Sequence, residues 1–253
     1  MRTADSFNNP VNTYAPCNKL TFSAPFEWLK KGWQDFKSAP WHSLVYGMIF
    51  AAMGWILIYF SWIGEHDMFI LALMVGFLLI GPALAFGLYD ISQELELKHQ
   101  PTFRHERRKA LREMGHELML ALLLGSVFLI LAIVVSIVIS IAVTPAQLGV
   151  SAVVPIPTMV SLSIAVIFAG LFFFASTFAL PMIVDKDVSA PKAIMTSLHA
   201  VWFNKSIIAL WALMILLLTV IGFATALIGL IFFVPLIGYA TWHAYRETII
   251  TKE

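Results

Sequence analysis

The stretch that decides the fold is Leu-Ile-Gly-Tyr-Ala-Thr-Trp-His-Ala-Tyr-Arg-Glu, residues 236–247, which closes the last long apolar run. Residues 79–90 read Leu-Ile-Gly-Pro-Ala-Leu-Ala-Phe-Gly-Leu-Tyr-Asp. The two stretches share the Leu-Ile-Gly start, the alanine two positions later and an acid at the end. Each returns the chain from an apolar run to polar sequence. The pattern therefore predicts the exit of a helix from a membrane, used in more than one repeating unit.

The composition indicates a membrane protein with several spans. Of the 253 residues, 60% are hydrophobic and 12% are charged. A soluble domain carries about 25% charged residues. Half that share, combined with long uncharged runs, is typical of a helical membrane protein. The net charge of +1 gives no reason to expect a nucleic-acid partner, and the single Cys17 rules out an internal disulfide.

The lengths of the apolar runs predict six transmembrane helices, because about 20 helical residues cross the hydrocarbon core. The long uncharged run before Asp185 is too long for one crossing and divides at the proline-rich loop Thr144–Pro157. This loop is apolar, so we expect it either to dip back into the outer interface or to dock on a partner. The predicted spans are Trp41–Ile63, Met68–Tyr89, Leu118–Val143, Thr158–Val184, Ser206–Phe223 and Ala226–Tyr245.

The positive charges predict the orientation. All 16 lysines and arginines precede the first span, follow the sixth, or lie between spans two and three or four and five. The opposite short loop holds Glu65, His66 and Asp67. Lysine and arginine collect on the cytoplasmic side of membrane proteins. Both ends of the chain are therefore predicted to be cytoplasmic.

The chain is predicted to be an all-α protein built from three repeats, about residues 25–97, 98–187 and 188–250, in one domain over 25–250. Each repeat begins with an amphipathic segment that we expect in the membrane interface and continues with a hairpin of two spans. Residues 1–24 are predicted to be a disordered cytoplasmic tail. The apolar face of the first segment is predicted to hold Phe26, Leu29, Trp33 and Phe36. The inward face of the third is predicted to hold Ile194, Met195, Leu198, Val201 and Trp202.

Each even-numbered span carries a proline before its cytoplasmic end: Pro82, Pro181 and Pro235. A proline inside a helix removes one backbone hydrogen bond and kinks the helix. Three kinks at a similar depth predict three hairpins that bend alike around a common axis.

Three stretches around these prolines resemble a known family. They are Gly-Pro-Ala-Leu-Ala-Phe-Gly-Leu-Tyr (81–89), Leu-Pro-Met-Ile-Val-Asp-Lys-Asp-Val (180–188) and Pro-Leu-Ile-Gly-Tyr-Ala-Thr-Trp-His-Ala-Tyr-Arg (235–246). Over about residues 25–250 the chain resembles the bacterial integral-membrane family called domain of unknown function 2189. The resemblance implies a protein of the bacterial inner membrane. Some members of the family carry labels as cytochrome c oxidase subunits.

The histidines argue against a catalytic oxidase subunit. Such a subunit needs about six histidines within its spans to hold haem iron and copper. None of the seven histidines lies in the middle of a predicted span; His42 and His243 lie at span ends. An accessory or assembly protein is compatible with this distribution.

The candidate functional residues lie at the cytoplasmic ends. Trp242, His243, Tyr245 and Arg246 form an aromatic and basic cluster suited to a lipid headgroup or a haem edge, or to an aromatic belt with a positive anchor. His199 is able to approach His243, although two histidines without a third ligand make a weak metal site. A basic run is predicted to bind anionic lipid; it comprises Arg104, Arg107, Arg108, Lys109 and Arg112.

The span interiors contain no lysine, arginine, aspartate or glutamate, which argues against a proton-coupled pump. No pattern for a catalytic, cofactor or metal site stands at usable spacing. We therefore predict no enzyme activity. The predicted function is a non-catalytic accessory or assembly subunit of a membrane complex, with membrane lipids and other subunits as partners. The alternative is a passive carrier or lipid-binding protein with a cavity between the proline-kinked even helices.

Overall fold

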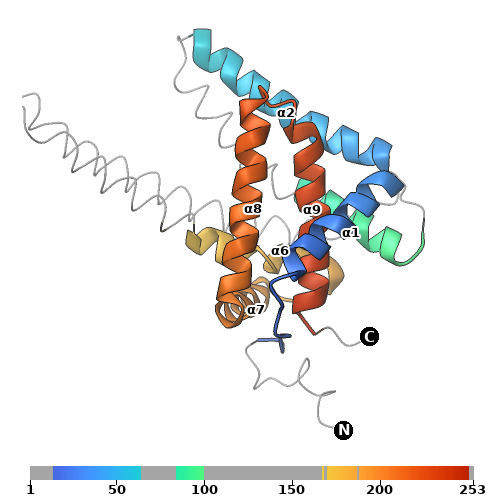
Figure 1. Ribbon diagram of the computed structural model, residues 1–253, viewed down its shortest axis with the longest axis vertical. Coiled ribbons are helices and arrows are strands. Elements are labelled where there is room, and N and C mark those ends of the chain that lie inside the picture. The colour runs from blue at the N-terminus through green and yellow to red at the C-terminus, as the bar shows by residue number, and fades with distance from the viewer. Residues whose placement is uncertain (1–13, 64–83, 100–166, 168–169, 187, 251–253) are drawn as a thin grey trace, which may run out of the picture.

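The structure is a computed structural model that describes residues 14–63, 84–99, 167, 170–186 and 188–250 (Figure 1). The described part is mostly helical, and its only extended pairing is an isolated bridge between Cys17 and Ile249. Further helical stretches cover residues 84–96 and 170–176. The named helices are α1 (Ala24–Ser38), α2 (Pro40–Ile63), α6 (Ala179–Asp185), α7 (Ala190–Phe203), α8 (Lys205–Ala224) and α9 (Leu230–Thr248).

Two described helices are long and apolar enough to cross a membrane: α2 over Pro40–Phe60 and α8 over Lys205–Ala224. They coincide with the first and fifth predicted spans. A shorter apolar helical stretch over Gly170–Asp185, with a turn at Thr177 and Phe178, covers the end of the fourth. The predicted third span, most of the second and the loop Thr144–Pro157 lie outside the described residues, so the six-span repeat stays a prediction.

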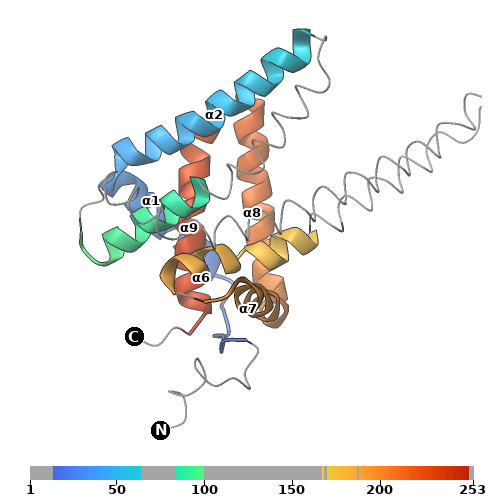
Figure 2. The ribbon, with the colours of Figure 1, turned by 180° about the vertical axis from the view of Figure 1, so that it is seen from behind.

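The sixth predicted span begins later than expected. The sequence placed its start at Ala226, but α9 begins at Leu230. Ala226 and Leu227 have φ values of 51° and 70°, in the left-handed region that cannot continue a right-handed helix. These two residues make the turn that returns the chain from α8 to α9, and the two helices run side by side in opposite directions (Figures 1 and 2).

Helix α9 is the centre of the described fold, and it contacts α1, α2, α6 and α8. Glycines on α1 and α2 allow the close crossings. A Cβ atom on Gly47 would lie 2.0 Å from the carbonyl oxygen of Ile231, and one on Gly32 would lie 2.8 Å from the amide nitrogen of Ala240. Pro235, one turn after Ile231, lacks the N–H group that normally bonds this carbonyl. The backbone of α2 at Gly47 therefore packs against the Ile231 carbonyl, to which Pro235 cannot donate a hydrogen bond.

The buried faces of α1 and α7 differ from the predicted ones. On α1, Trp28, Gly32 and Phe36 are buried, whereas Phe26 and Trp33 are exposed. On α7 most of the buried side chains are small or carry a hydroxyl; Val201 is buried as predicted, whereas Met195 and Trp202 are exposed. Small side chains bring helices closer together than large ones. Large apolar residues suit both a protein core and a lipid interface, so hydrophobicity alone does not determine which residues of α7 face inward.

The described end of the predicted tail is an ordered strap, residues 14–23. Its Ala15 and Leu20 are buried. The Ala15 amide donates to Thr196 Oγ1 at 3.1 Å, and the Leu20 amide donates to Asn204 Oδ1 at 2.9 Å. Asn204 Nδ2 in turn donates to the Asn18 carbonyl at 2.9 Å. Side chains of α7 and its end thus satisfy the strap backbone, which is why this part of the predicted disordered segment 1–24 is held in place.

The other edge of the strap pairs with the end of α9. The Asn18 amide donates to the Thr248 carbonyl at 2.8 Å, and the Ile250 amide donates to the Pro16 carbonyl at 3.0 Å. Between them lies Cys17, whose burial raises the pKa of its thiol from 9.0 to about 11. The strap therefore joins α7 to α9 and shields this thiol.

Asn204→Ala is expected to loosen the strap, because it removes both side-chain bonds to the strap backbone. Release returns the pKa of the Cys17 thiol toward its ordinary value and raises the thiolate fraction at neutral pH by up to about a hundredfold. Maleimide labelling of Cys17 should accelerate accordingly. Gln34→Ala, on the exposed face of α1, is the control. Equal labelling rates in Asn204→Ala and the control would contradict this role of Asn204.

The fourth predicted span is interrupted one turn before Pro181. Residues 170–176 are helical, Thr177 and Phe178 form a turn, and α6 begins at Ala179. Ser197 of α7 lies in the interruption: its hydroxyl accepts from the Phe178 amide at 3.1 Å and donates to the Phe174 carbonyl at 2.7 Å. These two backbone groups, four residues apart, would bond each other in an unbroken helix. The serine hydroxyl thus substitutes for the backbone bond lost at the break.

Ser197→Ala is expected to lower the free energy of unfolding by about 1–3 kcal/mol, because it leaves the buried Phe178 N–H and the part-buried Phe174 C=O without this partner. Thermal denaturation of the purified protein measures the effect. Ser38→Ala is the control, since the exposed Ser38 hydroxyl bonds only the carbonyl of Gln34 in its own helix. Equal denaturation temperatures for Ser197→Ala and Ser38→Ala would contradict the bridging role of Ser197.

Candidate functional site

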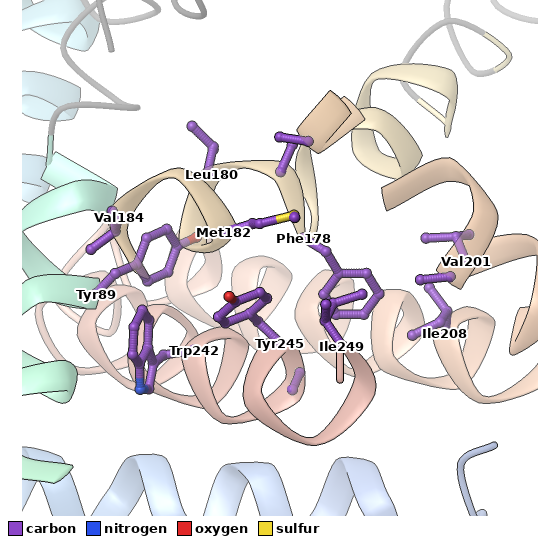
Figure 3. Packing of buried hydrophobic residues seen from close by; sticks show 14 of the residues in the cluster. Tyr89, Phe178, Leu180, Met182, Val184, Val201, Ile208, Trp242, Tyr245 and Ile249 are labelled. Atoms are coloured by element: carbon purple, nitrogen blue, oxygen red, sulfur yellow. The ribbon is translucent and has the colours of Figure 1, made fainter. Parts of the chain in front are cut away.

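The candidate site is a junction where the end of α9 meets residues 84–96, α6 and α1. Tyr89, Met182 and Val184 from the first two elements pack beside Trp242 and Tyr245 of α9 in one buried cluster (Figure 3). Both α9 side chains are fully buried. Contacts with protein therefore replace the lipid contact predicted for Trp242 and Tyr245.

Arg246 joins α9 to two acids from different helices. Its Nε and Nη2 atoms donate to Glu96 Oε1 at 3.1 and 3.0 Å, and its Nη1 lies 3.5 Å from Asp185 Oδ2. The neighbouring aromatic residues bond the same acids: Trp242 Nε1 donates to Glu96 Oε2 at 3.1 Å, and the Tyr245 hydroxyl donates to Asp185 Oδ2 at 2.7 Å. One turn of α9 thus holds both carboxylates by charged and neutral donors together.

The acids favour the charged form of Arg246. Burial by itself lowers the pKa of the guanidinium, but the hydrogen bonds and negative charge of Glu96, with that of Asp185, outweigh it and raise this pKa. Asp185 needs these donors because its side chain is only 8% exposed, and Gln93 Nε2 adds another at 3.3 Å. A buried carboxylate is stable only when it is paired and hydrogen-bonded.

His243 bonds a third acid. Its Nε2 atom lies 2.8 Å from Asp35 Oδ2 of α1, and the Ser92 hydroxyl donates to the same oxygen. A nucleophilic serine needs the histidine as its proton acceptor. Here the Ser92 hydroxyl donates its hydrogen bond to the carboxylate instead. The trio therefore joins α1, residues 84–96 and α9, and it does not activate Ser92.

The structure does not bring His199 to His243. The His199 ring stacks on Tyr14 of the strap, with ring centres 4.0 Å apart, while His243 bonds Asp35. In the described ranges, no group of three histidine, cysteine or acidic residues is placed to hold a metal ion. The predicted lipid patch of Arg104, Arg107, Arg108, Lys109 and Arg112 lies outside these ranges, as does Pro82.

Sequence reasoning missed Asp35, Ser92 and Glu96 as members of the junction. For each of these residues, its position on one side of a helix could have indicated that it faces the junction. Asp35 lies three residues after Gly32 and seven after Trp28, on the side of α1 that faces α9. Ser92 and Glu96 are one turn apart, which places both on one side of their helix.

Span-length apolar helices, with polar side chains gathered at one shared junction, are typical of a helical integral membrane protein. Residues 69–185 match the model of the family described as predicted integral membrane protein, domain of unknown function 2189, which confirms the resemblance. The match includes Glu96 and Asp185 but not residues 235–246, so it is shorter than the resemblance inferred over about residues 25–250. No curated protein and no solved structure matches the chain.

Proposed function

We propose that the protein is a non-catalytic accessory or assembly subunit of a membrane complex, with a respiratory oxidase as the first complex to examine. The observation that supports this proposal most is that the polar side chains at the end of α9 bond other elements of the protein. Arg246, His243 and Glu247 each bond a side chain of another element, the last accepting from Trp28 Nε1 at 2.8 Å. These groups hold helices together, which is a structural use of residue types that enzymes use for chemistry.

The packing at the junction also favours an interaction role over the carrier alternative. A carrier needs open space between its even helices. Where residues 84–96 meet α9, a Cβ atom on Gly238 would lie 2.7 Å from Leu88 Cδ1. This close contact leaves no room for a substrate between the two elements at that level.

The outer surface of α8 gives such a subunit a place to meet lipid or a neighbouring subunit. It exposes a run of large apolar side chains: Leu213, Leu216, Leu217, Val220 and Phe223. Apolar surface of this extent is stable only when it is covered. Under this proposal, lipid covers part of this surface and a partner subunit covers the rest.

Purification from native membranes in mild detergent tests the proposal, using a tag after Glu253 and an untagged strain as the control. We expect the protein to migrate on a native gel within a larger assembly and to retain the same partner subunits in repeated preparations. Migration as a lone protein with bound lipid would contradict the proposal and favour the lipid-binding alternative.

We also propose that the protein lies in the bacterial inner membrane with both ends in the cytoplasm, on the basis of the lysine and arginine distribution. A reporter that is active only in the cytoplasm should work when fused after Glu253 and should fail when inserted at residues 64–67. Activity at both positions would contradict the proposed orientation.

A further inference from the structure

Helix α1 carries a second apolar stripe, on the side opposite α9. Phe26 and Trp33 are 59% and 45% exposed, and the exposed Phe22 lies in the turn just before the helix. Phe26 and Trp33 are seven positions apart, which places them on one helical face. The buried residues Trp28 and Gly32 occupy the other side. Helix α1 therefore presents apolar surface both to the protein and away from it.

Helix α7 has the same arrangement. Met195 and Trp202, seven residues apart, are exposed on one face, with Trp202 78% exposed. Ala193, Ser197 and Ala200 are buried on the opposite face. Two amphipathic segments far apart in the sequence thus turn large apolar side chains outward.

A lysine lies over the outward tryptophan of each helix. Lys37 Nζ is 5.9 Å from the Trp33 ring centre, and Lys205 Nζ is 5.7 Å from the Trp202 ring centre. A cation over the face of an indole is attracted by the ring electrons. An indole with an ammonium group beside it suits the membrane interface, where apolar acyl chains meet charged phosphates.

Each helix is held at the start of a span by a very short link. Only Ala39 separates α1 from α2, and only Asn204 separates α7 from α8. One residue reaches no further than about 3.6 Å. Because α2 and α8 are the described helices long and apolar enough to cross a membrane, the C-terminal ends of α1 and α7 lie beside the start of those helices.

We propose that the outward stripes of α1 and α7 are seated in the phospholipid headgroup layer. The rings of Phe26, Trp33 and Trp202 lie at the acyl boundary, and Lys37 and Lys205 extend to the phosphates. This contact anchors the first and third repeats to the membrane surface. It goes beyond the proposed subunit role, because it involves lipid and requires no partner complex.

Spin labels report directly whether the outward side chains of α1 and α7 lie in lipid. The full chain carries one cysteine, so a Cys17→Ser background leaves a single labelling site for each introduced cysteine. Labels replace Phe26, Trp33 or Trp202 in protein reconstituted into phosphatidylcholine nanodiscs. The matched control is a label at Gln34, which is exposed and adjacent to Trp33. Labels at two positions of α1 keep the test valid if the Trp202 variant fails to fold.

The readout compares collisions of each label with oxygen, which enters lipid, and with a water-soluble nickel chelate. At Phe26, Trp33 and Trp202 we expect oxygen collisions to exceed chelate collisions, with the reverse at Gln34. Chelate access equal to that at Gln34 would overturn the proposal by placing these side chains in water. Low access to both reagents would also overturn it, because a protein surface would then cover them.

Discussion

Replacing Gly47 by alanine is expected to separate α2 from α9 and to leave little stably folded protein. The added Cβ atom would lie 2.0 Å from the Ile231 carbonyl oxygen and 2.6 Å from its carbon. Both atoms belong to helix backbone, so no side chain can rotate to make room. Overpacking costs about 1–3 kcal/mol when side chains adjust and more when backbones must move. We therefore expect a loss of at least about 3 kcal/mol.

The control for this variant is Gly170→Ala. Gly170 is helical, and a Cβ atom there would meet nothing within 4 Å. Alanine in an open helical position stabilises by about 0.5–1 kcal/mol. Thermal denaturation in detergent should give a much lower midpoint for Gly47→Ala than for Gly170→Ala. Equal midpoints would show that α2 does not approach α9 as closely as the structure places it.

Replacing Arg246 by methionine is expected to destabilise the junction by about 2–4 kcal/mol. The change keeps an unbranched apolar stem but removes two bonds to Glu96 and the positive charge beside the buried Asp185. Glu96 is partly exposed, so water compensates some of its loss, and the estimate lies below the full cost of breaking a buried pair. Chemical or thermal unfolding of the purified protein measures the change.

Two further variants make the Arg246 experiment specific. Lys31→Met removes an exposed cation from α1 and should change stability little. Arg246→Lys keeps the charge but cannot reproduce the forked donation to Glu96, so it should fall between the parent and Arg246→Met. If Arg246→Met were as stable as Lys31→Met, the ion pairs would not hold the junction.

Much of the helical framework could be predicted from sequence because it follows from length and composition. Helices α2 and α8 coincide with predicted spans, since an uncharged apolar run of that length leaves few alternatives. The exit of α9 was also found, because the run ends abruptly at His243 and Arg246. The inward face of α7 was predicted only in part: Val201 is buried, but Met195 and Trp202 are exposed, since large apolar residues suit both a protein core and a lipid interface.

The contacts of the site were less predictable because they depend on packing between distant elements. Asp35 and His243 are 208 residues apart, and Arg246 and Glu96 are 150 apart. No local pattern specifies which acid a basic residue will meet. The strap was missed for a related reason: its backbone is held by Thr196 and Asn204, and a polar, proline-containing sequence does not reveal such distant partners.

A double-mutant cycle between Arg246 and Glu96 tests most directly whether the end of α9 is a structural junction. Arg246→Met and Glu96→Gln are measured singly and together, and the glutamine keeps an acceptor for Trp242 Nε1. We predict that the double variant loses less stability than the two single losses combined, by about 1–3 kcal/mol, because both changes remove the same contact. Additive losses would contradict a direct interaction between the two side chains and, with it, the structural role of this helix end.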